Sequence, residues 1–431
     1  MKKSMTHILI VGFALFSMLF GAGNVIFPPY LGLGAGSQWG LGFLFYYVAD
    51  IGLALVALFA VQKSGGYDSI TRPVGKTAST LLMSLIVLCI GPMVGIPRTA
   101  ASTLELSVLP IFPEMNAVVF SAIFFVIIAL LCLRESSVVD IIGKVLTPLL
   151  IVGLMILIIK GVVDPIGPVP QGVLVDNVPA TGIEAGYQTM DVLAIVIFGI
   201  IISKSVKAKG YDTARSQNRI ILGAGAVAGI FLCIMYLGLT YLGVTASGMF
   251  DLSVDRTVLV TTIVHALLGQ TGTVLFGIVV ALACVTTAVA LVSCAADYFA
   301  TLSGGRIKYT WLVVGICIFS GFFSTFGLNQ IISIAAPILD VVYPPTLMLL
   351  AMSFFARRVS NVWAYRLGAL GALVVSVMTV STRFGAPFGF LANLPLYSLG
   401  FGWILPAIVC AVVGSMIPSH CTQKVLADTE C

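Results

Sequence analysis

Charged residues are scarce in this chain of 431 residues. Asp, Glu, Lys and Arg make up 9% of it, hydrophobic residues make up 59%, and the mean hydropathy is +1.12. Soluble domains carry about 25% charged residues, so a water-soluble form of this chain would expose large apolar patches. The same composition suits a lipid solvent, in which helices satisfy their own backbone hydrogen bonds. The sequence therefore predicts an all-α polytopic membrane protein.

Residues that commonly build active sites and metal sites are few or scattered. The histidines His7, His265 and His420 lie far apart in the chain, and the nine cysteines include no CxxC pair. No nucleophile–base cluster, disulfide framework or metal site is indicated. The net charge of +5 is spread over short loops, which argues against nucleic-acid binding. We expect no enzymatic activity, no cofactor, no nucleic-acid partner and no obligate protein partner.

Long apolar runs are abundant. A helix needs about 20 apolar residues to cross the hydrocarbon core, and we predict twelve such spans. They are His7–Pro28, Trp39–Val61, Thr77–Thr99, Met115–Leu133, Val138–Ile159, Gly186–Ser203, Ile220–Leu242, Thr271–Leu302, Trp311–Phe326, Ile332–Phe355, Val362–Val380 and Leu394–Ile417. A short surface helix is predicted at Asp255–Leu268, and Gly327–Ile334 is a candidate separate helical piece before the tenth span.

Basic residues are distributed unevenly between the loops. With a cytoplasmic N-terminus, the inside segments hold 18 Lys and Arg, the outside segments hold 3, and Arg98 within the third span completes the 22. Positive residues favour the cytoplasmic side, so both termini are predicted to be cytoplasmic. Cleavage of a signal peptide formed by Lys2-Lys3 and Ile8–Phe20 is the alternative, but it leaves eleven spans and reverses the N-terminus.

The first span contains the interruption Gly21-Ala22-Gly23-Asn24, followed by Pro28-Pro29. Glycine and proline weaken a continuous helix, and backbone freed in lipid is tolerated only beside a cavity. One interpretation is a discontinuous helix whose free N–H and C=O groups face a ligand. Close packing of the GxG against a neighbouring helix is the other interpretation, and the segment alone favours neither.

A second break is expected in the sixth span, where Phe198-Gly199 occupies a comparable position. If spans one to five form a repeat, span six enters from the opposite side, as in transporters whose paired broken helices mark the binding site. We expect one transporter domain over residues 1–431, with repeats at about 7–160 and 186–356 and two extra helices at about 362–417. Pro148 and Pro344-Pro345 are expected to interrupt the paired spans five and ten.

The eighth span places Thr286 and Thr287 on the same helix face as Ala283. Two hydroxyls together with carbonyls of an unwound first span would form an all-oxygen site of the kind that hard cations prefer. Alternatively, each hydroxyl bonds a carbonyl of its own helix, as is common in membrane helices. The segment by itself favours this alternative.

Charged residues at membrane depth are costly and usually functional. The candidates are Asp50, Arg98, Glu105, Asp191, Asp297 and Asp340. Asp50 and Asp297 lie near span ends and are expected to reach the interface. A proton-carrying or gating role is one interpretation for Glu105, Asp191 and Arg98. Asp191 precedes the proposed break in span six, and a solvated position at the outer mouth is the alternative for it.

Four motifs together resemble the bacterial branched-chain amino acid:cation symporter family, called BrnQ or LIVCS. The motifs are FGAGNVIFPPYLG (Phe20–Gly32), GPMVGIPRTA (Gly91–Ala100), GYQTMDVLA (Gly186–Ala194) followed by FGIII (Phe198–Ile202), and ISIAAPILDVVYPP (Ile332–Pro345). The resemblance runs from the first span through the last. It implies sodium-coupled uptake of leucine, isoleucine and valine across the bacterial cytoplasmic membrane, on a LeuT-type inverted-repeat fold.

The resemblance also implies roles for individual residues. Ala22 and Gly23 would present amides to the substrate carboxylate beside Gly21, and Asn24 would brace the break. Span six would contribute Ala194, Phe198 and Gly199. The implied sodium ligands are the carbonyls of Ser17, Phe20 and Ala283 and the hydroxyls of Thr286 and Thr287.

The sequence is compatible with several third-span contacts and with several modes of transport. The nearest candidates for a third-span contact are Pro97, Arg98 and Thr99. A proton-coupled symporter with Asp191 or Glu105 as the carrier, an amino acid exchanger of the APC type, and a channel or nutrient sensor are the alternatives to sodium symport.

Overall fold

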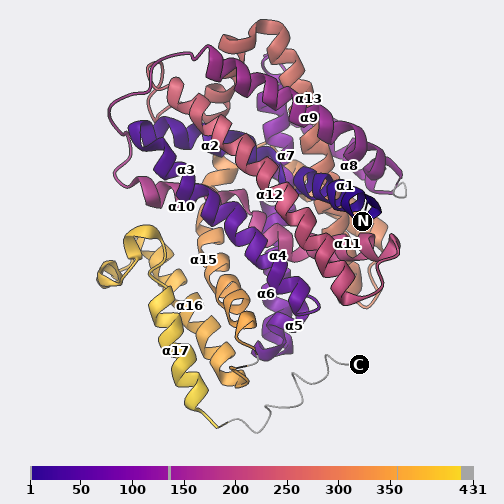
Figure 1. Ribbon diagram of the computed structural model, residues 1–431, viewed down its shortest axis with the longest axis vertical. Coiled ribbons are helices and arrows are strands. Elements are labelled where there is room, and N and C mark those ends of the chain that lie inside the picture. Colours follow the sequence, from indigo (N-terminus) through magenta and orange to yellow (C-terminus); the bar gives the residue numbers. More distant parts are fainter. Residues whose placement is uncertain (1, 134–136, 357, 419–431) are drawn as a thin grey trace.

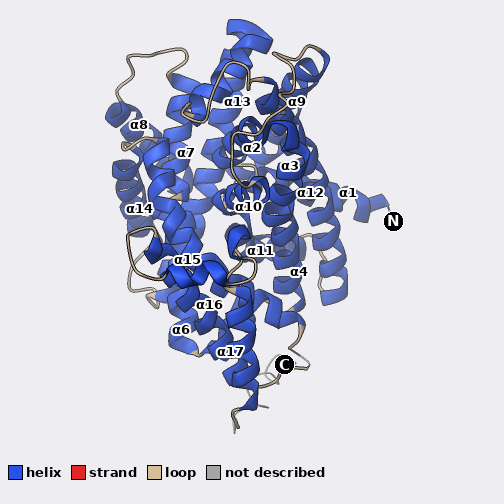
Figure 2. Cartoon of the chain, turned by 90° about the vertical axis from the view of Figure 1, so that its left-hand side faces the viewer, coloured by secondary structure: helices blue, strands red, loops and turns tan. Residues whose placement is uncertain are grey.

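The computed structural model of the chain describes residues 2–133, 137–356 and 358–418. Every regular element in these ranges is helical (Figure 2). Six described helical stretches are long and apolar enough to cross a membrane, and five shorter apolar helices of 10–17 residues accompany them. The protein is therefore a polytopic α-helical membrane protein, as predicted.

Each predicted span corresponds to one helix or to consecutive helices. The α-helices are α1 (Lys2–Leu19), α2 (Ala22–Ala35), α3 (Trp39–Tyr47), α4 (Leu53–Lys63), α5 (Tyr67–Thr71), α6 (Lys76–Leu88), α7 (Gly95–Thr103), α8 (Ala117–Leu133), α9 (Ser137–Val163), α10 (Val178–Thr189), α11 (Asp191–Ala208), α12 (Ala214–Thr245), α13 (Arg256–Leu302), α14 (Tyr309–Ser324), α15 (Leu328–Phe354), α16 (Val362–Thr382) and α17 (Ile404–Met416). The last predicted span is α-helical only from Ile404, because turns and short 3₁₀ helices precede it.

The first span is broken where the sequence predicted. α1 ends at Leu19 and α2 begins at Ala22, and Gly21 between them has an extended backbone (φ −104°, ψ −169°). The helix α2 continues through Pro28 and Pro29. The two prolines are therefore accommodated within a helix, and the interruption lies at Gly21.

The sixth span is broken at Met190, and the prediction of a break at Phe198-Gly199 was wrong. α10 ends at Thr189, α11 begins at Asp191, and Met190 between them has a left-handed backbone (φ 68°, ψ 13°). A left-handed residue ends an α-helix, whereas a glycine inside one only weakens it. Figure 2 shows α10 and α11 following one another near the middle of the molecule. Asp191 consequently follows the break instead of preceding it.

The predicted proline interruptions of spans five and ten are also absent from the described helices. α9 runs through Pro148, and α15 runs through Pro337, Pro344 and Pro345. Residues 328–334 form the start of α15 rather than a separate piece. Membrane helices tolerate proline because neighbouring groups satisfy the freed carbonyls.

The predicted surface helix at Asp255–Leu268 forms the first part of α13. The Asp255 carboxylate accepts a hydrogen bond from the Thr257 N–H at 2.9 Å and caps the helix. At Gly269 the backbone leaves the helical region (φ 63°, ψ −166°). This kink separates the surface helix from the eighth span.

Both broken spans are enclosed by other helices. α2 packs against α12 so closely that a Cβ on Gly243 would lie 1.9 Å from the Pro29 carbonyl oxygen. α10 packs against α3, and α11 packs against α4. α16 and α17 lie side by side at one edge of the molecule, next to α15 (Figure 1). The irregular backbone at Gly21 and Met190 is thereby kept away from lipid, as membrane proteins require.

Candidate substrate and ion site

The two helix breaks meet at a small cavity that is also lined by the third and eighth spans. Its lining residues are Met18, Leu19, Gly21, Asn24, Ile90, Gly95, Arg98, Thr99, Thr189, Met190, Asp191, Ala194, Phe198, Thr287 and Leu291. The volume of about 40 Å³ offers room for a few water molecules rather than a whole amino acid. Binding of an amino acid here requires the surrounding helix halves to move apart.

Asn24 joins the two breaks through one side chain. It is 1% exposed, and its Oδ1 accepts the Gly21 N–H at 3.3 Å. Its Nδ2 donates to Asp191 Oδ2 at 3.0 Å and also to the Tyr236 hydroxyl. The amide therefore fixes the extended residue of the first span relative to the first residue of α11.

Arg98 binds the end of α10. Its side chain on α7 is 5% exposed, Nη1 donates to the Gln188 carbonyl at 2.6 Å, and Nη2 donates to the Thr189 carbonyl at 3.1 Å. The last carbonyls of a helix lack helical donors, and a cation there also complements the helix dipole. The guanidinium carbon lies 5.8 Å from the centre of the Phe27 ring. Arg98 thus connects the third span to both broken spans.

Asp50 and Asp191 form a buried carboxyl pair beside the second break. Asp50 lies in the π-helical turn Val48–Gly52, is 0% exposed, and accepts the Thr189 hydroxyl at 2.8 Å. Its Oδ2 has no hydrogen-bond partner among the described residues, and Asp191 on the other side of the break is 3% exposed. The expected interfacial position of Asp50 and the solvated alternative for Asp191 are both wrong.

Two of the four helix ends created by the breaks carry a charged side chain. The carbonyl end of α10 has Arg98, and the amide end of α11 begins with Asp191. In the described turns at the end of α1 and the start of α2, no basic or acidic residue is present. The helix dipoles therefore suit the start of α2 to an anionic group and the end of α1 to a cation, and the Leu19 carbonyl already accepts the Gly21 N–H at 2.8 Å.

The two threonines of the eighth span have different environments. Thr287 is 8% exposed, its hydroxyl has no partner among the described residues, and a Cβ on Gly21 would lie 3.8 Å from its Oγ1. Thr286 instead donates its hydroxyl to the Ala283 carbonyl of its own helix at 2.8 Å. The alternative of bonding within the helix applies to Thr286, whereas Thr287 faces the first break.

Some of the remaining predicted residues line the cavity and others do not. Ala194 and Phe198 line the cavity. Gly199 does not face it, since a Cβ there would contact Val61 on α4 at 3.4 Å. The cavity lining of the described structure also leaves out Ser17, Phe20, Gly23, Ala283 and Thr286, and the side chain of Ala22 is not among those described. Phe20 instead stacks on Phe16 and Tyr236.

Glu105 lies away from the breaks. Its carboxylate accepts the Thr257 hydroxyl at 3.0 Å and the Leu328 N–H at 2.9 Å. It therefore ties the end of the third span to the start of α13 and the start of α15, and it makes no contact of this kind with Arg98.

Comparison with known proteins decides the family. The model of the branched-chain amino acid transport protein family matches residues 4–421. The chain belongs to this family. It is 33% identical over 427 residues to the branched-chain amino acid permease BraB of Bacillus subtilis, covering 95% of each chain. It is 31% identical over 432 residues to the branched-chain amino acid permease BrnQ of Salmonella typhimurium, covering 95% of this chain and 96% of the relative.

The fold of this branched-chain amino acid transport protein is similar to that of a solved transporter. Mhp1, a nucleobase-cation-symport-1 family transporter solved in a closed conformation with bromovinylhydantoin bound, superposes with a TM-score of 0.64 at 12% identity, over 97% of this chain and 96% of that chain. The predicted family and the predicted LeuT-type fold are both confirmed. The boundaries given for the two repeats stay predictions.

Proposed function

We propose that the protein is a secondary transporter that imports leucine, isoleucine and valine by sodium symport across the bacterial cytoplasmic membrane, with both termini in the cytoplasm. The observation that carries the proposal is the break at Gly21, where one amide end and one carbonyl end have no charged side chain of their own. The permease names of BraB and BrnQ support the substrate class.

A zwitterion at membrane depth needs oriented dipoles in place of water. The substrate carboxylate binds the Ala22 and Gly23 amides at the start of α2, and the ammonium binds carbonyls at the helix ends. The apolar side chain lies among Ile90, Ala194, Phe198 and Leu291, which line the cavity. Because one methylene is worth about 1–3 kcal/mol in such a pocket, leucine, isoleucine and valine bind with modest differences.

The sodium ion binds between the carbonyls that end α1, at Ser17 and Phe20, and the eighth span with its Ala283 carbonyl and its Thr286 and Thr287 hydroxyls. Support comes from the unpartnered Thr287 hydroxyl beside Gly21. An ion in this position holds α1 against α13 while the substrate holds α2. Both ligands then favour the same closed arrangement, which is the basis of coupling.

The proposal is tested by leucine uptake and counterflow in proteoliposomes of the purified protein, with sodium, lithium and pH varied independently. We expect concentrative leucine uptake only with an inward sodium gradient. Equal uptake with and without that gradient rejects sodium coupling, and a requirement for amino acid inside the vesicles identifies an exchanger. Leucine flux that fails to saturate identifies a channel.

Replacing Thr287 by alanine is expected to raise the sodium concentration for half-maximal uptake by about tenfold, because one oxygen ligand is lost. The measurement is leucine uptake against sodium concentration at saturating leucine. Thr346→Ala is the matched control, since Thr346 is also buried but donates its hydroxyl to the Val342 carbonyl within α15. An unchanged sodium dependence in Thr287→Ala argues against this residue as a ligand.

Proton coupling is the second candidate, favoured by the Asp50–Asp191 pair. The pair touches both sides of the sixth-span break, because Thr189 donates to Asp50 and Asp191 begins α11. The charged or titratable groups that influence the pair electrostatically include Arg98 and the hydroxyls of Tyr46, Tyr47, Tyr236 and Tyr343. A proton held between the carboxyl groups would leave one negative charge facing the Arg98 cation.

The variant Asp191→Asn separates the two couplings. Under sodium coupling we expect uptake by Asp191→Asn to be slower but still to require sodium, because the ion site on α1 and α13 is intact. Under proton coupling, uptake by Asp191→Asn no longer responds to an inward proton gradient, because the asparagine amide cannot bind and release the coupled proton. The measurement is leucine uptake under each gradient applied alone.

A further inference from the structure

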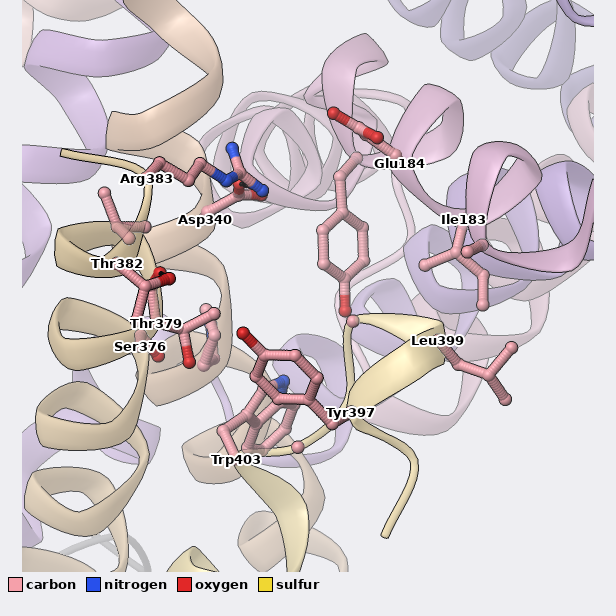
Figure 3. A pocket seen from close by; sticks show the side chains of 16 residues that line it. Ile183, Glu184, Asp340, Ser376, Thr379, Thr382, Arg383, Tyr397, Leu399 and Trp403 are labelled. Carbon is pink, nitrogen blue, oxygen red and sulfur yellow. Dashed lines mark hydrogen bonds and ion pairs between the residues drawn. The ribbon is translucent and has the colours of Figure 1, made fainter. Parts of the chain in front are cut away.

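A second cavity lies between α10, α15, α16 and the turns before α17, and we call it the α10–α16 cavity (Figure 3). Its volume is about 260 Å³, against about 40 Å³ for the cavity at the helix breaks. Sixteen residues line it, and none of them lines the central cavity. The space therefore admits a small molecule without rearrangement of the transport site.

One end of the α10–α16 cavity carries an excess of negative charge. Arg383 Nη2 pairs with Asp340 Oδ2 at 2.8 Å, and Glu184 on α10 also lines the cavity. Figure 3 shows Arg383 and Asp340 together, with Glu184 across the opening from them. Two carboxylates face one guanidinium, so this end attracts a further cation.

Buried donors without acceptors line the same cavity. The Trp403 side chain is 8% exposed and Tyr187 is 4% exposed, and neither the Trp403 Nε1–H nor the Tyr187 hydroxyl has a partner in the part of the chain that the structure describes. Figure 3 shows Trp403 at the end of the cavity away from Arg383 and Glu184. A buried donor left unpaired is costly, so these two groups favour a ligand with an acceptor, best an anionic oxygen.

The walls between the charged end and the donors are mixed, because Ser376, Thr379 and Tyr397 add hydroxyls to an apolar lining. Ile183, Pro344, Val380 and Leu399 contribute to the apolar part. A ligand that satisfies all three regions carries a cationic donor, an anionic oxygen group and an apolar portion.

We propose that the α10–α16 cavity binds a molecule bearing a primary ammonium beside an anionic oxygen group, which is either a free α-amino acid or the headgroup of phosphatidylethanolamine. The ammonium lies between Glu184 and Asp340, the anionic oxygen accepts from Tyr187, and the rest of the ligand extends toward Trp403. This site is separate from the transport site and is occupied independently of it.

Occupancy of the α10–α16 cavity acts on transport through α10. Glu184 also lines a third cavity together with Phe27 and Arg256. The final carbonyls of α10 are those that Arg98 binds. A ligand that bridges α10 to α15 and α16 restrains the outer half of the sixth span. Leucine or lipid bound there therefore regulates opening of the outer side.

The test uses tryptophan fluorescence of the full-length protein in nanodiscs. The chain has four tryptophans, so Trp403→Phe identifies the signal of the cavity. Trp311→Phe is the matched control, because the Trp311 side chain on α14 is 70% exposed.

Leucine is titrated into nanodiscs of phosphatidylcholine only, which has no primary ammonium. A second series replaces part of that lipid by phosphatidylethanolamine. The probes 4-methylpentanoate, without the ammonium, and 3-methylbutylamine, without the carboxylate, test the two charged contacts.

We expect a saturable change in fluorescence that is absent in Trp403→Phe and present in Trp311→Phe. A response to leucine in pure phosphatidylcholine assigns the site to a free amino acid, and a response only to phosphatidylethanolamine assigns it to the lipid. Glu184→Gln and Tyr187→Phe are expected to weaken the response by about tenfold each, with folding checked by size-exclusion chromatography. Either probe alone is expected to bind more weakly than leucine if leucine is the ligand.

Two results overturn the proposal. One is the lack of any Trp403-dependent response to leucine and to phosphatidylethanolamine, and the other is an unchanged response in both folded variants. Failure of the transport proposal gives a different result: leucine counterflow is absent, but the Trp403-dependent fluorescence change remains.

Discussion

Arg98→Ala is expected to reduce leucine uptake by more than about 100-fold and to destabilise the protein by roughly 3–5 kcal/mol. The substitution leaves the Gln188 and Thr189 carbonyls without their buried donor and removes the cation that faces Asp50 and Asp191. The end of α10 then loses its fixed position next to the first break. Uptake in proteoliposomes and thermal stability in detergent measure the two effects.

Arg98→Lys distinguishes charge from geometry. Lysine keeps the cation but cannot donate to two carbonyls through a planar fork, so uptake is expected to recover only in part. Arg366→Ala is the control for loss of an arginine elsewhere. Arg366 lies on α16 and donates to the Pro73 carbonyl, away from the two helix breaks. Near-normal uptake in Arg98→Ala would contradict the assignment of Arg98 as the residue that positions α10.

Gly23→Ala is expected to lower leucine uptake by at least about tenfold, although it adds only one methyl group. A Cβ at this position would lie 2.9 Å from Arg98 Nη2, 3.0 Å from Arg98 Cζ and 3.1 Å from Phe27 Cε2. The guanidinium cannot withdraw freely because two hydrogen bonds to α10 hold it. Initial rates of leucine uptake measure the effect.

Gly315→Ala is the matched control, since Gly315 lies within α14 and a Cβ there would meet nothing within 4 Å. The double variant Gly23→Ala, Arg98→Ala provides a further check. Because both substitutions act on the same guanidinium, their effects on uptake should not add. Full additivity would show that Gly23→Ala acts by another route.

The break in the first span was predictable because its cause is visible in the sequence. Gly21 and Gly23 interrupt an apolar run and lower its helix propensity, although without the family motifs close packing of the two glycines explains the segment equally well. The break in the sixth span was placed wrongly because Met190 is an ordinary helix former with no local signal. Its left-handed backbone depends on the packing around α10 and α11. The pairing of spans one and six located the correct helix but not the correct residue.

The polar residues of the site show the same limit. Asp50 stood out as a charge in an apolar span, yet its burial depends on the π-helical turn at 48–52, which sequence periodicity does not reveal. Tyr236 reaches Asn24 from the middle of α12, and a tyrosine in an apolar helix gives no indication of its partner. Thr286 and Thr287 are the same residue type, so the sequence does not distinguish their roles. Only the three-dimensional structure shows that one hydroxyl bonds its own helix and the other faces Gly21.

The two interruptions differ in torsional stiffness. The first is centred on a glycine, whose backbone crosses between conformations at little cost. The second is centred on Met190 at φ 68°, where a side chain confines the backbone to a narrow well that costs about 1–3 kcal/mol to occupy. The residue that joins α1 to α2 therefore has more conformational freedom than Met190, which joins α10 to α11. We expect bending during transport to be concentrated at Gly21, with the two halves of the sixth span moving together.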